Sequence, residues 1–149
     1  MGKYARTTSV SVAKSKAEIE VILQRYGASE FAYGTRAGEA VVMFQVGPRR
    51  IRFTLPLPSV NDPDVLKNSY GHQRPLPVRE KITEQLGRSA WRSLALVIKA
   101  KLEAVESGIT TLDREFLGYM VLPNGDTIAD WAEGKLDEFG TKMPPLLTG

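Results

Sequence analysis

The sequence predicts an α+β domain in which a helix, a three-stranded antiparallel meander and a long helix follow one another (α-β-β-β-α), before a small C-terminal helical part. Two observations predict this order. Apolar residues recur at helical spacing before residue 27 and again over residues 78–107, whereas residues 31–55 carry β-branched and alternating runs separated by turns. A chain of 149 residues also buries enough surface to fold without a disulfide or a metal.

A first helix is predicted to begin at Ser15, because Ser15 and Glu18 form an S-x-x-E capping box for the free N–H groups of a helix start. Apolar residues follow at helical spacing, namely Ile19, Ile22, Leu23 and Tyr26. Gly27 then supplies the left-handed conformation that ends many helices. The polar segment before it leaves two alternatives open, an arm or a first edge strand over residues 8–12.

Three strands are predicted at residues 31–35, 40–46 and 50–55, with turns at 36–39 and 47–49. In the third strand Ile51, Phe53 and Leu55 point to one face of the sheet. Arg50, Arg52 and Thr54 point to the other. We therefore expect an antiparallel sheet with one face on the helices and one solvated, basic face.

Residues 56–77 contain five prolines and no periodicity, which predicts a long irregular loop that is either functional or disordered. The longest helix is predicted over residues 78–107, ended by Gly108. Thr111 is expected to cap a short helix through residue 117. We then expect either a strand or an extended stretch at 119–122, followed by a turn at 123–126 and a last helix at 127–139. The chain finishes with a proline-broken apolar segment at 143–147.

The formal net charge of +3 hides an asymmetry. Residues 1–101 hold 17 lysines and arginines against 8 aspartates and glutamates, whereas residues 102–149 hold 3 against 9. The sequence thus predicts a basic core domain at 1–108 and an acidic C-terminal appendage at 109–149 packed on it. The charges either mark a binding face or neutralise each other within the fold.

A basic stripe lies along the predicted long helix, because four of its cations fall within about 40° on a helical wheel, opposite the apolar arc. Together with the arginines of the third strand they are the candidate phosphate contacts: Arg50, Arg52, Lys81, Arg88, Arg92 and Lys99. If the helix borders the open sheet face, all six line one groove. Tyr33 and Tyr70 are candidate stacking residues for unpaired bases, with core packing as the alternative for Tyr33.

Catalysis is not predicted. The chain has no cysteine and one histidine, His72, and it shows no nucleophile elbow, P-loop or metal-ligand motif. Two acidic pairs are the nearest to a magnesium site, Asp113 with Glu115 and Asp126 with Asp130, but both are typical of helix starts and turns. We expect no metal and no cofactor.

The predicted order of elements is similar to that of double-stranded-RNA-binding domains and to the core of single-strand annealing proteins of the RecT and Red-beta type. More specifically, the sequence resembles a family of uncharacterised proteins of tailed bacteriophages and prophages. The stretches that carry this resemblance are VSVAKS at 10–15 with the helix up to residue 27, IRFTLP at 51–56, residues 95–108 and 116–125, and MPPLL at 143–147. The resemblance implies a small phage protein in the host bacterial cytoplasm.

These observations favour a phage-encoded, non-catalytic nucleic-acid-binding protein that acts in single-strand binding, annealing or recombination. A module that binds a host defence or transcription complex, or a subunit of a phage assembly, is the alternative, with Trp131, Phe139 and Leu146 as its contacts. An enzyme acting on a nucleotide signal is a third hypothesis. We expect the partner to be a nucleic acid, single-stranded rather than duplex, and a homo-oligomer is one option. We expect no association with a membrane, because apolar runs are short and no signal peptide begins the chain.

Overall fold

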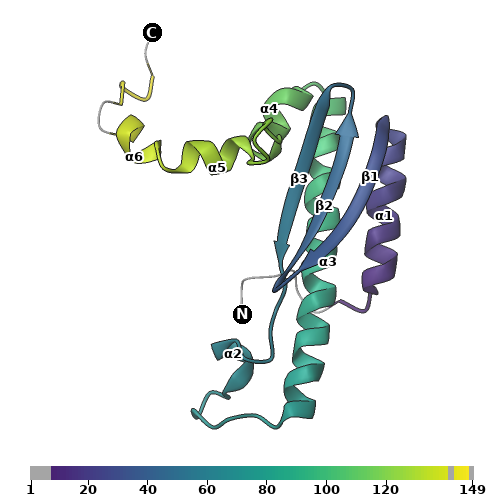
Figure 1. The fold of residues 1–149 in the computed structure, drawn as a ribbon, viewed down its shortest axis with the longest axis vertical. Coiled ribbons are helices and arrows are strands. Elements are labelled where there is room, and N and C mark those ends of the chain that lie inside the picture. Colours follow the sequence, from purple (N-terminus) through teal and green to yellow (C-terminus); the bar gives the residue numbers. More distant parts are fainter. Residues whose placement is uncertain (1–7, 141–142, 148–149) are drawn as a thin grey trace.

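The computed structural model describes residues 8–140 and 143–147, and Figure 1 shows how they are arranged. Helix α1 (Val12–Arg25) precedes strands β1 (Ala28–Arg36), β2 (Glu39–Val46) and β3 (Arg49–Pro56), and α3 (Leu76–Glu106) follows them after a connecting segment. The strands form one antiparallel sheet in the order β1-β2-β3. The predicted order of helix, meander and long helix is therefore confirmed.

The molecule has two layers, because α1 and α3 lie side by side on one face of the sheet and leave the other face open (Figure 1). Alternate strand residues face the helices and are buried, as in Val42 and Phe44 of β2 and Ile51 and Phe53 of β3. They share one core with the apolar side of α3, which contributes Trp91, Leu94, Ala95, Ile98 and Leu102. The core thus lies between the sheet and the helix pair.

Helix α1 begins earlier than the capping box predicts. Ser11 is its N-cap, and the Ser11 hydroxyl accepts a hydrogen bond of 3.1 Å from the backbone N–H of Lys14. Ser15 instead lies inside the helix, where its side chain is buried, and Glu18 pairs with Arg92 of α3. The edge-strand alternative for residues 8–12 is wrong, since residues 8–11 are irregular and Val12 opens the helix; the part of the predicted arm at 1–7 lies outside the described residues.

The proline-rich connection at 56–77 has more structure than its composition predicts. It contains the short helix α2 (Pro63–Leu66), whose Val65 is buried. Two arginines hold the segment in place. Arg74 donates through Nη1 to the carbonyl oxygens of α2, and Arg79 in the first turns of α3 donates to the carbonyl of Arg74 at 3.0 Å. Hydrogen bonds from arginine side chains to backbone carbonyls therefore help to order this segment. Such bonds follow no periodic sequence pattern, so the sequence does not predict them.

The C-terminal part forms α4 (Leu112–Phe116), the 3₁₀ helix η1 (Leu117–Tyr119), α5 (Ile128–Glu133) and α6 (Leu136–Phe139). Thr111 caps α4 as predicted, since its hydroxyl accepts from the backbone N–H of Arg114. The single helix predicted at 127–139 is wrong, because Gly134 ends α5 and the chain turns before α6. None of the helices in the described ranges is both long and apolar enough to cross a lipid bilayer.

The first half of this C-terminal part completes the core. Phe116 is fully buried, and its ring meets those of Phe44 and Phe53 edge-on at 6.0 and 6.2 Å between centroids. Met120 is buried as well and pairs with Ile51 at the edge of β3. The segment that the charge pattern set apart as an appendage thus belongs, up to Ile128, to the same core, and α5 and α6 project from it (Figure 1).

Candidate nucleic-acid interface

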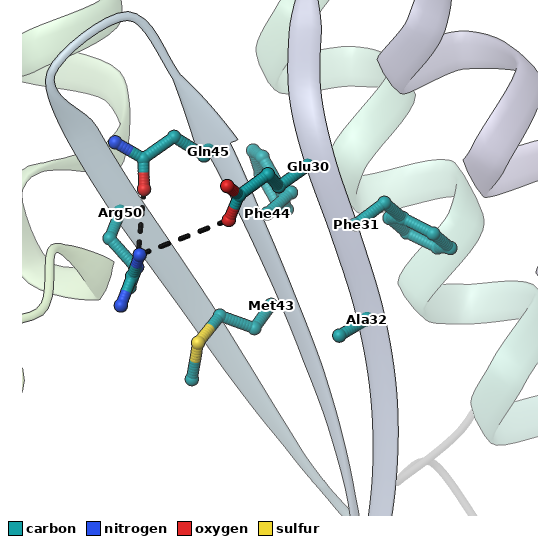
Figure 2. A pocket seen from close by; sticks show the side chains of 7 residues that line it. All are labelled: Glu30, Phe31, Ala32, Met43, Phe44, Gln45 and Arg50. Atoms are coloured by element: carbon teal, nitrogen blue, oxygen red, sulfur yellow. Dashed lines mark hydrogen bonds and ion pairs between the residues drawn. The ribbon is translucent and has the colours of Figure 1, made fainter.

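Two groups of basic residues were predicted to bind phosphates, and the first of them lies on the open face of the sheet. Figure 2 shows Arg50 there, on the same row as Glu30 and Gln45. Its Nε donates to Oε1 of Gln45 at 3.1 Å, and its Nη2 lies 3.9 Å from Oε2 of Glu30. Arg50 is therefore balanced by a carboxylate on its own sheet face.

Arg52, the other predicted phosphate contact on β3, anchors the C-terminal part. Its side chain is only 17% exposed. Nη1 donates to the carbonyl of Gly125 at 2.8 Å, and Nη2 lies 3.7 Å from Oδ2 of Asp130. Gly125 has a φ of 91°, which permits the turn that brings its carbonyl to the guanidinium. Nη1 and Nη2 of Arg52 therefore hold a turn and a carboxylate of the C-terminal part, while its buried Nε has no hydrogen-bond partner among the described residues. The structure thus gives Arg52 a structural role.

Opposite charges of the two halves of the chain neutralise each other in the same region. Besides Arg52 with Asp130, Arg49 forms a two-pronged pair with Asp113, at 2.9 and 3.0 Å, and Lys101 lies 3.3 Å from Glu115. Arg49 lowers the pKa of Asp113 below its usual range through this hydrogen bond, and Thr127 lowers that of Asp130 through its backbone and hydroxyl. Ion pairs within the fold thus neutralise part of the opposite charge of the two halves of the chain.

The second group, the basic stripe of α3, lies on the opposite side of the molecule. Arg50 and Arg52 project away from Ile51 and Phe53, which belong to the core shared with α3. The stripe projects from the side of α3 away from Leu94 and Ile98, and its Arg92 faces Glu18 of α1. The expectation that all six cations line one groove is therefore wrong. The helices pack on the apolar face of the sheet, so the sheet core separates the two sets.

A different groove forms between α1 and α3. It is a hollow of about 600 Å³ whose walls carry four cations and one carboxylate: Lys14, Arg25, Arg92, Lys99 and Glu18. Arg92 donates to Glu18, whereas no ion pair of Lys14 or Lys99 is found within the described part of the chain. The structure thus places Arg92 and Lys99 of the predicted set beside two cations that the sequence analysis did not select.

Comparison with protein-family models, with curated proteins and with solved structures found no match to this chain. The function is therefore inferred from the charge and geometry of the described residues.

The two cations from α1 were detectable from spacing. Lys14, Glu18, Val21 and Arg25 follow one another at intervals of four, three and four residues, which places them on one side of a helix. This side carries two cations, with Glu18 and Val21 between them. The sequence analysis selected only the apolar residues of this helix. The polar side of α1 becomes part of a groove only when α1 packs against α3.

The remaining stripe residues extend the basic surface toward the start of α3. Lys81 is exposed, and Arg88 donates to the side chain of Gln85. From Lys81 to Lys99 the helix rises about 27 Å. At the other end the surface turns acidic, because Glu103 and Glu106 follow on the same side, and the hydrogen bond from Tyr26 to Glu106 raises the pKa of the Tyr26 hydroxyl.

Of the two candidate stacking residues, one is unsuited to that role. Tyr33 lies on the helix-facing side of β1, with its ring edge-on to Trp91 at 5.9 Å and its hydroxyl donating to the carbonyl of Lys16. Burial raises the pKa of Tyr33 to about 12. Tyr70 is 84% exposed in the loop between α2 and α3, which Arg79 holds on the side of α3 away from Lys81. Its ring therefore stays a candidate base contact that lies apart from the basic stripe.

The carboxylates that came nearest to a metal site have structural roles. Asp113 and Glu115 pair with Arg49 and Lys101, and the side chain of Asp130 closes a capping box with Thr127 at the start of α5. Within residues 8–140 and 143–147, His, Asp and Glu side chains form no group of three or more that could hold a metal ion.

The residues predicted to contact a protein partner all lie at the surface. Trp131 and Phe139 are each 58% exposed on α5 and α6, and Leu146 is fully exposed beyond them. Leu136, Met143 and Leu147 are exposed in the same segment. This concentration of exposed apolar side chains beyond Ile128 contrasts with the buried apolar residues just before it.

Proposed function

We propose that this protein binds single-stranded nucleic acid, without catalysis, along the outer side of α1 and α3. The observation that carries the proposal is the groove between these helices, in which four cations face one carboxylate. Cations on the walls of an open groove suit a chain of phosphates, because phosphate contacts need shared orientation and not a fixed spacing. Lys81 and Arg88 extend this surface along α3.

A single strand fits this surface better than a duplex. Helix α1 packs along α3, and the N-terminal turns of α3 that extend past the sheet pack against the α2 segment (Figure 1), so neither helix stands free to enter the major groove. A groove between two packed helices has room along its length for the phosphates of one nucleic-acid strand. Because the sequence resembles proteins of tailed bacteriophages, the proposed role is in recombination, replication or protection of single strands in the bacterial cytoplasm.

The test is a titration of fluorescently labelled single-stranded DNA, single-stranded RNA and duplex DNA at about 50 and 200 mM salt. If the groove neutralises four phosphates, the slope of log affinity against log salt is about −2.8, and affinity for a single strand falls about 50-fold over this range. The double variant Lys14→Ala/Lys99→Ala should reduce the slope by about 1.4. Lys67→Ala, an exposed lysine on another part of the surface, is the matched control.

Three results would refute the proposal: no binding at 50 mM salt, equal losses in the double variant and the control, or tighter binding of the duplex than of the single strand. Protein recognition through Trp131, Phe139 and Leu146 is the second candidate function, favoured by the exposure of these side chains. It predicts a partner that is retained at high salt, where phosphate contacts fail.

A further inference from the structure

The segment from α5 to α6 exposes large apolar side chains, as segments that bind another surface do. Trp131, Leu136 and Phe139 are each 58% exposed. At about 200 Å² for an aromatic side chain, the two rings alone leave on the order of 230 Å² in water. An exposed apolar area of this kind marks a contact with another surface.

The same segment is acidic. Residues 128–140 hold four carboxylates and one lysine, namely Asp130, Glu133, Asp137, Glu138 and Lys135. The amine of Lys135 lies 5.4 Å from the centre of the Trp131 ring, so the one cation already faces an aromatic side chain. We call residues 128–140 the C-terminal arm. It combines large apolar side chains with a net charge of −3.

The groove between α1 and α3 has the complementary composition. Its apolar lining comes from Val10, Ala17, Val21 and Ile22, and Val21 is largely exposed. Around this lining stand four cations against Glu18. The groove therefore carries a net charge of +3 over an apolar floor, and its volume of about 600 Å³ is in the range that accepts large side chains.

The arm of a molecule does not lie near its own groove. Its start is fixed at the edge of β3 by the bond from the Ile128 N–H to the Met120 carbonyl at 2.9 Å and by the Arg52–Asp130 pair. From there it points away from the sheet, while α1 lies beside β1 at the opposite edge (Figure 1). An arm that enters this groove therefore comes from another copy.

We propose that the C-terminal arm of one copy docks in the α1–α3 groove of a second copy. This is a head-to-tail contact, because arm and groove are different surfaces, and repetition closes a ring or extends a filament. The inference rests on the groove that the proposed function also uses. Arm and nucleic acid then compete for the same cations, so the acidic arm restrains binding until a strand displaces it.

The test compares self-association by analytical ultracentrifugation in wild type and in two charge-reversed variants. Lys14→Glu/Lys99→Glu reverses the groove, and Glu133→Lys/Asp137→Lys reverses the arm; all four residues are exposed. Each variant alone should associate at least tenfold more weakly than wild type, since like charges meet. A mixture of the two should regain association, because a reversed groove meets a reversed arm. Lys67→Glu, the control, should behave as wild type.

A monomeric wild type at about 100 μM, or a mixture that associates no better than the separate variants, would overturn the proposal. Trp131→Ala/Phe139→Ala supplies a second measurement that leaves the charges intact and should also weaken association. The two proposals fail separately. Loss of DNA binding in Lys14→Ala/Lys99→Ala without any self-association of wild type leaves only the nucleic-acid site standing, whereas self-association without DNA binding leaves only the contact between copies.

Discussion

The buried hydroxyl of Ser15 permits a test in which two serines four residues apart respond with opposite sign. Ser15 is 0% exposed, and its hydroxyl oxygen has no hydrogen-bond partner among the residues that the structure describes. Ser11 caps the helix through its hydroxyl. We expect Ser15→Ala to stabilise the protein and Ser11→Ala to destabilise it.

The magnitude for Ser15→Ala follows from three contributions. A buried polar group without a partner costs about 1–3 kcal/mol, which the substitution recovers. Alanine exceeds serine in helix propensity by about 0.5 kcal/mol. Loss of the packing contacts of one oxygen atom removes about 0.5–1 kcal/mol. The sum is a gain of about 0.5–3 kcal/mol, whereas removing the cap at Ser11 costs about 1 kcal/mol.

Urea unfolding followed by circular dichroism measures both variants. With a slope of about 2 kcal/mol per molar urea, the midpoint should rise by about 0.25–1.5 M in Ser15→Ala and fall by about 0.5 M in Ser11→Ala. The reverse pattern would place the cap at Ser15, as the S-x-x-E spacing predicts, and would refute the buried position.

Two further predictions concern the attachment of the C-terminal part. Phe116→Ala removes a fully buried ring between Phe44 and Phe53 and should lower the free energy of unfolding by about 3–5 kcal/mol in one cooperative urea transition; a separate early transition with the main one unchanged would contradict a shared core. Asp113 has a lowered pKa because Arg49 donates to it, so its stabilisation is complete above the usual aspartate pKa of about 3.9 and is lost as pH falls through the lower folded value. Wild type should therefore exceed Asp113→Asn in stability at about pH 6 and approach it near pH 2, and a difference that persists at pH 2 would show that the pair is not its source.

Local patterns determined the elements of this fold because each depends on neighbours a few residues apart. Alternation in β3 separates Ile51 and Phe53 from Arg50 and Arg52, and the three- and four-residue recurrence of apolar positions marks α3. The cap at Thr111 is equally local. Errors arose where two local solutions compete, as at Ser11 and Ser15, or where a glycine divides a helical pattern, as at Gly134.

The candidate site depended on tertiary structure. The sequence by itself determined that basic residues line one side of α3 and one face of β3. Only the packing of both helices on the apolar sheet face decided that these two sets lie apart, that Arg52 serves the C-terminal turn, and that Lys14 and Arg25 join Arg92 and Lys99. The physical reason is that periodicity specifies which way a side chain points from its own element, whereas a groove requires two elements and the apolar surfaces that bring them together.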